Sequence, residues 1–453
     1  MPARLSKEEI SLLKPNSKRM MDSLHETCRF GAGVPWSSDA DSTQTGMSRL
    51  ALSDADREVR DWFCQKVRDL GCQITVDAMG NIFAIRPGRN QGPATFAGSH
   101  LDTQPTGGRY DGILGIHAGV EMLEVLEDNK IETEFPVGVV NWTNEEGARF
   151  PMSMMGSGVW AGSVPLDAAH SSRDVKTGVT MLSELERIGY SGPSPADYNH
   201  MPMAAHFELH IEQGPRLENE KKKIGVVLGV QGYKWFTITV TGEECHTGTT
   251  DMASRSDPLH KACKMILRTQ RAAVRHSALA GTGILTVEPG STNTVPGKVS
   301  FSLDLRASSD QTLKKLTEKL RYDFECIAED TTYTNKTCKV EWRTDFKSPV
   351  IKFNKDCVAC VREAAQSIFP EDDMTLDMTS GAGHDSVCAN RVCPTSMIFV
   401  PSQNGVSHNP HEYTSPEDCT VGAEVLMKSV LSYDKLRAER AAHEGTAATK
   451  TDG

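Results

Sequence analysis

The chain of 453 residues has little that would take it into a membrane or onto a nucleic acid. No apolar run approaches the roughly 20 residues that a membrane-spanning helix needs. The formal net charge is −11, which opposes binding to nucleic acids and to anionic membrane surfaces. A single local arginine can still bind an anionic substrate. The first 20 residues are charged and lack the apolar core of a secretory signal, so a cytoplasmic location is expected.

Disulfide bonds are not expected either. The twelve cysteines are scattered through a long chain, which favours reduced and mostly buried thiols. Cys357 and Cys360 form one CxxC pair, but no second CxxC or histidine pair accompanies it. The pair also falls in a helix-like stretch, so a structural role is expected for it.

The hydrophobic pattern indicates two domains. A chain of this length exceeds what one hydrophobic core usually organises. Beyond a helical lead-in, short apolar strands alternate with helices, and this order predicts a parallel α/β sheet with ligands at the strand ends. The expected helices cover 54–70 and 116–128, and the expected strands cover 73–77, 81–86, 94–99, 137–142 and 395–400.

A second order of elements occupies the middle of the chain, at about residues 231–346. Strand, helix, strand, strand, helix and strand follow one another, which is the ferredoxin-like arrangement. The expected segments are 234–241, 258–276, 283–288, 299–306, 311–329 and 338–343. Because the α/β pattern resumes afterwards, this domain is expected to be inserted into a discontinuous larger domain, residues 1–230 and 347–453.

Polar residues gather after the expected strands of the larger domain. They are His100, Asp102 and Asp111 after 94–99, Glu145 and Glu146 after 137–142, Glu208, His210 and Glu212 on one face of an alternating segment, and His408 after 395–400. Each motif alone is common in solvated loops. Their joint occurrence at strand ends of one sheet favours a single site.

Five of these residues carry side chains that bind transition metals, namely His100, Asp111, Glu146, His210 and His408. Three imidazoles and two carboxylates suffice for two ions when one carboxylate bridges them, which predicts a dizinc site. The adjacent carboxylates of Glu145 and Glu146 repel each other, so they are expected to need a cation nearby. Asp102 is expected to accept the second ring N–H of His100 and to fix its tautomer.

Seven motifs of the chain resemble the amidohydrolase branch of the M20 metallopeptidase family. They are GSHLDT (98–103), GGRYDGILG (107–115), NEEGARF (144–150), HFELHIEQGP (206–215), HTGTT (246–250), SGAGHD (380–385) and SHN (407–409). The branch includes β-ureidopropionase (β-alanine synthase), N-carbamoyl-L-amino acid hydrolases and allantoate amidohydrolases. Three segments, 140–150, 296–306 and 397–402, look closest to fungal-type β-alanine synthase.

The resemblance implies a fold and a cofactor. It implies a two-metal catalytic α/β domain with a central mixed sheet, and an inserted ferredoxin-like domain that acts as a lid and joins two copies in a homodimer. One ion is expected on His100, Asp111 and His210. The other is expected on Asp111, Glu146 and His408, with Asp111 bridging. Zn²⁺ is the first expectation, and Mn²⁺, Co²⁺ or Ni²⁺ also suit such ligands.

The resemblance also implies roles around the ions. Glu145 is expected to act as the general base, and His246 is expected to stabilise an oxyanion. Substrate contacts are expected from Gln213, Asn293, Arg306 and His384, and two of these, Asn293 and Arg306, are expected to hold a carboxylate. The family often has alanine where this chain has Cys245 and Thr247, which alters the packing beside His246.

These assignments predict an enzyme that hydrolyses the ureido amide of a small carboxylate substrate. The first candidate is N-carbamyl-β-alanine, which would give β-alanine, CO₂ and ammonia. N-carbamoyl-α-L-amino acids and allantoate are the alternatives, because their hydrolases share the motifs above. Outside enzymes, the alternative is a ligand-binding relative without activity. The complete set of five ligands together with Glu145 argues against it.

Overall fold

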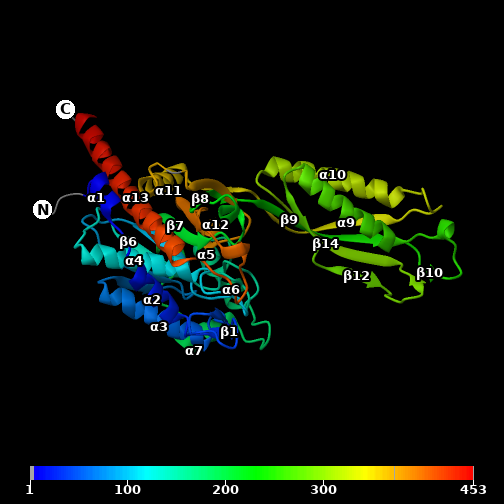
Figure 1. The fold of residues 1–453 in the computed structure, drawn as a ribbon, viewed down its shortest axis with the longest axis horizontal. Helices are drawn as coiled ribbons and strands as arrows, with labels where there is room; N and C mark the ends of the chain where they lie inside the picture. Colours follow the sequence, from blue (N-terminus) through cyan, green and yellow to red (C-terminus); the bar gives the residue numbers. More distant parts are fainter. Residues whose placement is uncertain (1–4, 372, 452–453) are drawn as a thin grey trace. The chain divides into compact units, whose positions relative to one another are not determined.

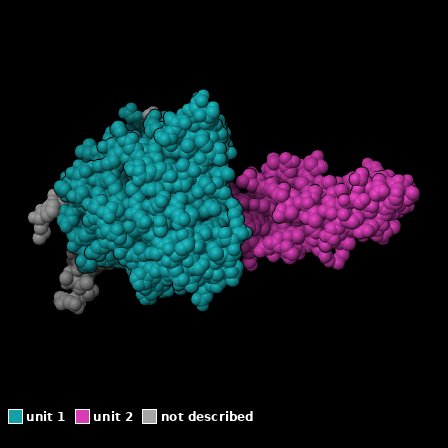
Figure 2. Space-filling view, turned by 90° about the horizontal axis from the view of Figure 1, so that it is seen from below, with its two compact units in different colours: residues 1–229, 353–453 teal, residues 230–352 magenta. Residues whose placement is uncertain are grey.

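The computed structural model describes residues 5–371 and 373–451. The chain divides into two compact units (Figure 2). Unit 1 comprises residues 1–229 and 353–453, and unit 2 comprises residues 230–352. The predicted inserted segment, 231–346, falls within unit 2. No helix in the described ranges is long and apolar enough to cross a membrane.

A nine-stranded mixed sheet organises the larger part of the chain (Figure 1). Its strands follow the order β16-β8-β18-β7-β5-β6-β4-β3, and β17 pairs with β8. The bounds are β3 (Gln73–Val76), β4 (Ile82–Arg86), β5 (Ala94–His100), β6 (Val137–Trp142), β7 (Met203–Ile211), β8 (Ile224–Val230), β16 (Ile351–Lys352), β17 (Thr375–Ser380) and β18 (Thr395–Val400). The predicted central mixed sheet is confirmed.

Four adjacent strands of this sheet, β18, β7, β5 and β6, are parallel. Every residue of β5, β6 and β18 is buried, as expected for strands covered on both faces. Parallel strands end at the same edge of a sheet. The chain segments that follow these four strands therefore meet there, which is where α/β sheets bind ligands.

Side chains of the sheet alternate between two hydrophobic clusters. On β4, Ile82 and Ala84 join the larger cluster and Phe83 joins the smaller one. Helices α2, α3, α4, α11 and α13 contribute to the larger cluster, and Trp160 and Ala389 contribute to the smaller. The helices of unit 1 are α1 (Lys7–Leu12), α2 (Ser17–Thr27), α3 (Asp54–Asp69), α4 (Ile113–Asp128), α5 (Met155–Trp160), α6 (Leu166–His170), α7 (Met181–Ile188), α8 (Arg216–Asn219), α11 (Lys355–Ile368), α12 (Asp385–Ala389) and α13 (Pro416–Thr451).

Smaller elements complete unit 1. The N-terminal region contains a short hairpin of β1 (Ala32–Pro35) and β2 (Thr45–Met47). A 3₁₀ turn, η2 (Gln403–Gly405), lies between β18 and α13. Cys357 and Cys360 are buried in α11 as free thiols, which agrees with a structural role.

Unit 2 has its own antiparallel sheet and its own hydrophobic core. Its elements follow the order strand, helix, strand, strand, helix and strand. They are β9 (Gly232–Thr241), α9 (Pro258–Arg275), β11 (Leu279–Gly281) with β12 (Leu285–Glu288), β14 (Lys298–Ala307), α10 (Asp310–Glu329) and β15 (Lys339–Ser348). A small ladder of β10 (Cys245–His246) and β13 (Thr294–Val295) and the turn η1 (Met252–Ser254) are added to these.

Alternation along β9 explains the core of unit 2. Phe236, Ile238 and Val240 are buried in it, and α9 and α10 contribute Met265 and Leu316 from their own apolar faces. The residues between those of β9 lie on the opposite face of the sheet. The sheet order β11-β14-β9-β15 places the first strand of the unit in the interior.

Candidate active site

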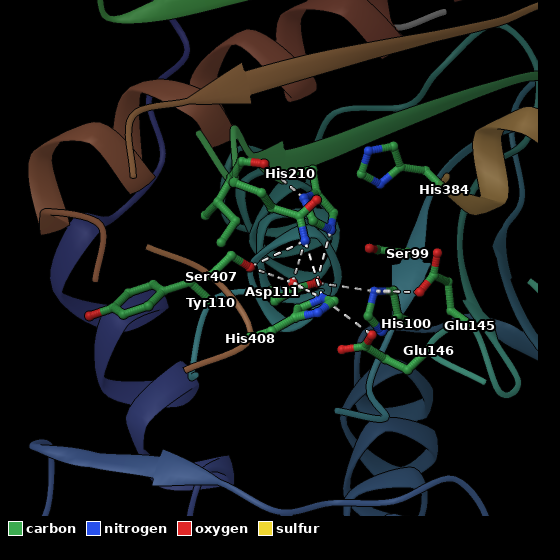
Figure 3. Close-up of polar contacts among 12 residues, drawn as sticks. Ser99, His100, Tyr110, Asp111, Glu145, Glu146, His210, His384, Ser407 and His408 are labelled. Carbon is green, nitrogen blue, oxygen red and sulfur yellow. Dashed lines mark hydrogen bonds and ion pairs between the residues drawn. The ribbon is translucent and has the colours of Figure 1, made fainter. Parts of the chain in front are cut away.

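The ends of the four parallel strands bring the predicted metal ligands together. Figure 3 shows their side chains pointing toward one another. His100 ends β5, and His210 lies one residue before the end of β7. Asp111 lies in the loop between β5 and α4, Glu146 lies four residues after β6, and His408 lies eight residues after β18.

His100, Asp111 and His210 form one group of candidate ligands. Asp111 Oδ1 lies 3.5 Å from His100 Nε2 and 3.1 Å from His210 Nε2. All three residues are buried. The neighbouring Gly112 has a φ of +68°, and a Cβ there would lie 2.3–2.5 Å from ring atoms of His100. Only glycine therefore lets the loop pass this close to the imidazole.

Asp111, Glu146 and His408 form a second group. His408 Nε2 lies 3.4 Å from Asp111 Oδ2 and 3.4 Å from Glu146 Oε2. The candidate ligand atoms of each group all lie within 4.8 Å of one another. Asp111 belongs to both groups and turns one oxygen to each, which is the arrangement of a bridging carboxylate.

The histidine rings of the first group are oriented for metal binding. The Nδ1 atoms of His100 and His210 each lie 2.9 Å from a main-chain carbonyl oxygen, that of Asp102 and that of Ile211. These bonds place the proton on Nδ1 and leave Nε2 as the ligand atom. Within the described residues, His100 Nε2 is buried without a hydrogen-bond partner, which is costly unless a cation binds it. The donor set fits two divalent metal ions.

The charges of the cluster shift its pKa values strongly. Burial lowers the pKa of His100, but the carboxylates of Glu145 and Asp111 outweigh burial and raise it well above the usual range. A hydrogen bond with Asp111 raises the pKa of His408 to about 9. Burial and the charge of Asp111 raise the pKa of Glu146 to about 7. Carboxylates this crowded repel one another, and a divalent cation between them removes the repulsion.

Hydrogen bonds to the main chain hold the loop that carries Glu145 and Glu146. Both residues donate their main-chain N–H groups to the carboxylate of Asp102 at 3.3 Å. Glu145 is buried, and its Oε2 lies 3.6 Å from His100 Nε2. Burial and the nearby carboxylates raise the pKa of Glu145 well above its usual range. A raised pKa makes a carboxylate a stronger base, which suits a group that accepts a proton and returns it.

Asp102 accepts the ring N–H of His100, as expected, but through its main chain. Its main-chain carbonyl accepts the ring N–H of His100, while its carboxylate oxygen lies 3.9 Å from the same nitrogen. The carboxylate is already occupied by the two main-chain donors of the Glu145–Glu146 loop. Asp102 therefore fixes the tautomer of His100 through its backbone and positions the next loop through its side chain.

Gln213 and His384 also lie at the cluster. Gln213 Nε2 donates to Asp111 Oδ2 at 2.7 Å and lies 3.2 Å from Ser407 Oγ. The ring of His384 is buried, with its centroid 4.5 Å from that of His210. Burial and the charge of His210 lower the pKa of His384 well below its usual range, so its ring is neutral.

The remaining predicted residues, His246, Asn293 and Arg306, belong to unit 2. His246 is exposed on β10, and the main-chain N–H of Thr247 donates to Asn293 O at 2.9 Å. Arg306 lies at the other end of β14. Its Nε and Nη2 atoms lie 3.0 and 2.8 Å from Asp304 Oδ2, and its guanidinium lies 5.3 Å from the ring centre of Tyr233. Unit 2 thus brings His246 and Asn293 together and keeps Arg306 apart from them.

A family model described as Peptidase family M20/M25/M40 matches residues 96–432. The chain belongs to this family. It is a hydrolase, as predicted, and the predicted M20 membership is confirmed. Three comparisons show what this M20 hydrolase is similar to. An N-carbamoyl-L-amino-acid amidohydrolase of Rhizobium meliloti is 38% identical over 419 residues, which are 92% of this chain and 96% of the relative.

The other two comparisons extend the range of relatives. A ureidoglycolate hydrolase of Oryza sativa subsp. japonica is 30% identical over 85% of this chain and 80% of its own. A solved structure of a hydantoinase/carbamoylase family amidase from Burkholderia multivorans is 41% identical, with a TM-score of 0.84 over 93% of this chain and 98% of that chain. The relatives therefore share both units of the M20 hydrolase.

Sequence reasoning assigned no role to three buried carboxylates beside the ligands of this M20 hydrolase, Glu208, Asp385 and Glu412. Glu208 accepts from Ser386 Oγ at 2.6 Å, and Asp385 accepts from Ser157 Oγ at 2.5 Å. Glu412 accepts the main-chain N–H of Asp111. The alternation around His210 pointed to Glu208, but a lone glutamate after His408 carries no signal of its own.

Proposed function

We propose that this M20 hydrolase cleaves the ureido amide of N-carbamoyl amino acids, releasing the amino acid, CO₂ and ammonia. The observation that carries the proposal is the pair of ligand groups that share Asp111, with the buried carboxyl group of Glu145 beside them. The matched N-carbamoyl-L-amino-acid amidohydrolase supports a ureido group as the group that is cleaved. A ligand-binding relative without activity is disfavoured, because every ligand and the base are present.

The proposed cofactor is a pair of divalent ions, Zn²⁺ first, with Mn²⁺, Co²⁺ or Ni²⁺ suited to the same ligands. When bound, such ions polarise the ureido carbonyl and lower the pKa of the attacking water. Glu145 takes a proton from that water and returns it to the departing nitrogen. Gln213 and His384 contact the substrate from the sides of the cluster.

The proposed role of unit 2 is that of a lid that recognises the substrate. His246 stabilises the negative charge that develops on the ureido oxygen as water attacks. Asn293 and Arg306 hold the substrate carboxylate. A planar guanidinium binds a carboxylate through two parallel hydrogen bonds, which a lysine cannot copy.

The length of β14 supports the proposal of a homodimer. Cross-strand pairs place Thr241 opposite Lys298 at one end and Tyr233 opposite Arg306 at the other. Before Lys298 in the chain, Thr294 pairs with His246 in the separate ladder of β10 and β13. At ~3.3 Å per residue, Lys298 and Arg306 lie roughly 26 Å apart. One copy of unit 2 therefore does not present Asn293 and Arg306 to one small carboxylate, and we infer that a second copy supplies His246 and Asn293.

Three substrate classes are candidates. The likeness of three segments to fungal-type β-alanine synthase favours N-carbamyl-β-alanine. The matched bacterial amidohydrolase favours N-carbamoyl-L-amino acids. Ureides are the third class, with allantoate suggested by the motifs and ureidoglycolate by the name of the rice relative.

A substrate panel tests the proposal. Purified protein loaded with Zn²⁺ or Mn²⁺ is given N-carbamyl-β-alanine, several N-carbamoyl-L-α-amino acids, allantoate, ureidoglycolate and a dipeptide, and ammonia release is measured alongside peptide cleavage. Ammonia from a carbamoyl amino acid, and no cleavage of the dipeptide, is expected. Cleavage of the dipeptide alone would show that the ureido assignment is wrong.

A further inference from the structure

Glu412 is a buried carboxylate that no step of the proposed reaction uses. It lies four residues after His408, between β18 and α13, and its side chain is inaccessible to solvent. Burying a carboxylate is unfavourable unless donors satisfy its oxygens. The donors that Glu412 uses therefore indicate its role.

One oxygen of Glu412 holds the chain at the shared ligand. Glu412 Oε1 accepts the main-chain N–H groups of Tyr110 and Asp111, both at 3.0 Å. The fit is close, because a Cβ on Gly108 would lie 2.2–2.4 Å from side-chain atoms of Glu412. The loop that carries Asp111 cannot shift without losing these bonds.

The other oxygen holds the loop of His408. Ser407, which directly precedes His408, donates its hydroxyl to Glu412 Oε2 at 3.0 Å, and the same Ser407 Oγ lies 3.0 Å from Asp111 Oδ2. The main-chain N–H of Glu412 donates to Asn409 O at 3.0 Å. A single carboxylate therefore ties together two ligand loops that lie about 300 residues apart in the sequence.

We propose that Glu412 is a positioning residue that sets the spacing of Asp111 and His408 and thereby the metal affinity of the second ligand group. The proposal rests on the metal centre of the proposed function. Removing a partner of a metal ligand typically lowers metal affinity or activity about 10- to 100-fold. The side-chain oxygen of a glutamine at 412 can accept hydrogen bonds from the two main-chain N–H groups. Its amide nitrogen is a donor, however, so it cannot accept the hydroxyl hydrogen of Ser407 as Glu412 Oε2 does. Glu412→Gln therefore keeps the shape and reverses one bond.

Asp434 offers a matched control. It is a buried carboxylate on α13 that also accepts two successive main-chain N–H groups, those of Glu134 and Phe135, at 2.7 and 2.8 Å. It belongs to neither ligand group. If Glu412 only stabilised the fold, Glu412→Gln and Asp434→Asn would lower the free energy of unfolding alike and leave metal binding unchanged.

The experiment titrates full-length protein, stripped of metal by a chelator, with Zn²⁺ in a calorimeter. We expect Glu412→Gln to weaken the binding of one ion about 10- to 100-fold, and Asp434→Asn to keep parental affinity for both. With metal in excess, KM of Glu412→Gln should stay near the parental value. Thermal unfolding of the stripped proteins measures the structural cost of each change.

Parental Zn²⁺ affinity in Glu412→Gln would overturn the proposal. If that variant does not fold, Glu412→Asp takes its place, since it keeps the charge and draws the oxygens back by one methylene. Parental affinity in Glu412→Asp would then overturn the proposal, and weakened affinity would support it. Because the titration uses no substrate, its outcome is independent of the ammonia panel, and a parent protein that hydrolyses no carbamoyl substrate would overturn only the proposed function.

Discussion

At the scale of single residues, Asp111 has the most demanding position in the site. Its Oδ1 faces two imidazoles, while its Oδ2 lies near His408, accepts from Gln213 and lies 3.0 Å from Ser407 Oγ. Burial would raise the pKa of Asp111, but the charges and hydrogen bonds of His210 and His100 hold it well below its usual range. The surrounding groups therefore favour the ionised carboxylate, which is the form that binds a cation.

Glu145→Gln and Glu146→Gln should separate the roles of two adjacent carboxylates. Glu146 belongs to a ligand group, whereas Glu145 lies beside one. We expect Glu145→Gln to keep its metal and to lose about 10²–10⁴-fold in turnover, the usual effect of losing a general base. Glu146→Gln should instead lose metal. Elemental analysis and kcat on the best panel substrate measure both effects, and equal metal loss in the two variants would contradict the assignment.

The residues of the cluster differ in how far sequence could predict them. His100, His210 and the Glu145–Glu146 pair stand out because polar side chains follow directly on buried strands. Glu412 does not, because its role depends on main-chain groups 302 and 301 positions away. The choice between the carbonyl and the carboxylate of Asp102 depends on which donors reach each group, and that is a matter of folded geometry.

At the scale of elements, the loop after β6 is held from outside by ion pairs. Arg149, three residues after Glu146, donates to Asp174 at 2.7 Å and to Glu184 at 2.6 Å. Burial would raise the pKa of Asp174, but Arg149 and the main-chain N–H groups of the next turn lower it to about 2. Asp174 is only 7% exposed, so the pair is little screened by water.

Asp174→Asn should reveal this pair through its pH dependence. The folded-state pKa lies below the unfolded value of 3.8, so the ionised Asp174 stabilises the protein above about pH 4 and loses that effect as the pH falls toward 2. We expect the variant to be less stable by about 2 kcal/mol at pH 7 and pH 5. The gap should narrow below pH 4. Urea unfolding of metal-free protein at each pH measures it, and a gap that does not change with pH would contradict the pairing.

Metal removal tests whether the fold of unit 1 is stable without the ions. The candidate ligands lie in loops and at strand ends, while the two hydrophobic clusters of unit 1 consist of other residues. Dialysis against a chelator should therefore abolish turnover and leave cooperative unfolding in place. Activity assays and calorimetric melting on the same sample check this, with restoration by added Zn²⁺ as the control. Full turnover after stripping would rule out the metal mechanism.

The sequence predicts elements best where one physical pattern dominates. The strands at Val137–Trp142 and Thr395–Val400 were predicted to the residue, because both are short apolar runs. The predicted strand 283–288 is shorter in the structure. Ser302 Oγ accepts the main-chain N–H groups of Gly283 and Ile284 at 3.1 and 3.0 Å, so a side chain takes two donors that a regular strand would give to main-chain carbonyls. Local propensity carries no information about such a partner.

At the scale of the whole molecule, the residues of the proposed mechanism are divided between the two units. Unit 1 contains both ligand groups and Glu145, and unit 2 contains His246, Asn293 and Arg306. Each unit has its own hydrophobic core. If the inferred homodimer is right, each complete site combines the metal centre of one copy with His246 of the second copy.

Mixing inactive variants tests this arrangement directly. Glu145→Gln disables the metal centre of its own copy, and His246→Ala disables the site to which its lid contributes. When the two variants are co-expressed, a dimer with one copy of each has one site that carries both changes and one site that carries neither. We expect about a quarter of parental turnover, because half of the dimers are mixed and each of these has one intact site.

The matched control for this experiment is co-expression of Glu145→Gln with Glu146→Gln. Both changes lie in unit 1, so every site of the mixed dimer keeps one defect and turnover should stay at the level of the separate variants. When the two variants carry different tags, two successive affinity steps isolate the mixed dimer of Glu145→Gln with His246→Ala. Half of the parental turnover is then expected for that dimer.

The roughly 26 Å between the two ends of β14 is the physical reason to expect restoration, since His246 and Arg306 of one copy are too far apart to meet one small substrate. An inactive mixed dimer of Glu145→Gln with His246→Ala would mean that His246 acts within its own copy, and Arg306 would then have to serve a site other than the one that His246 completes.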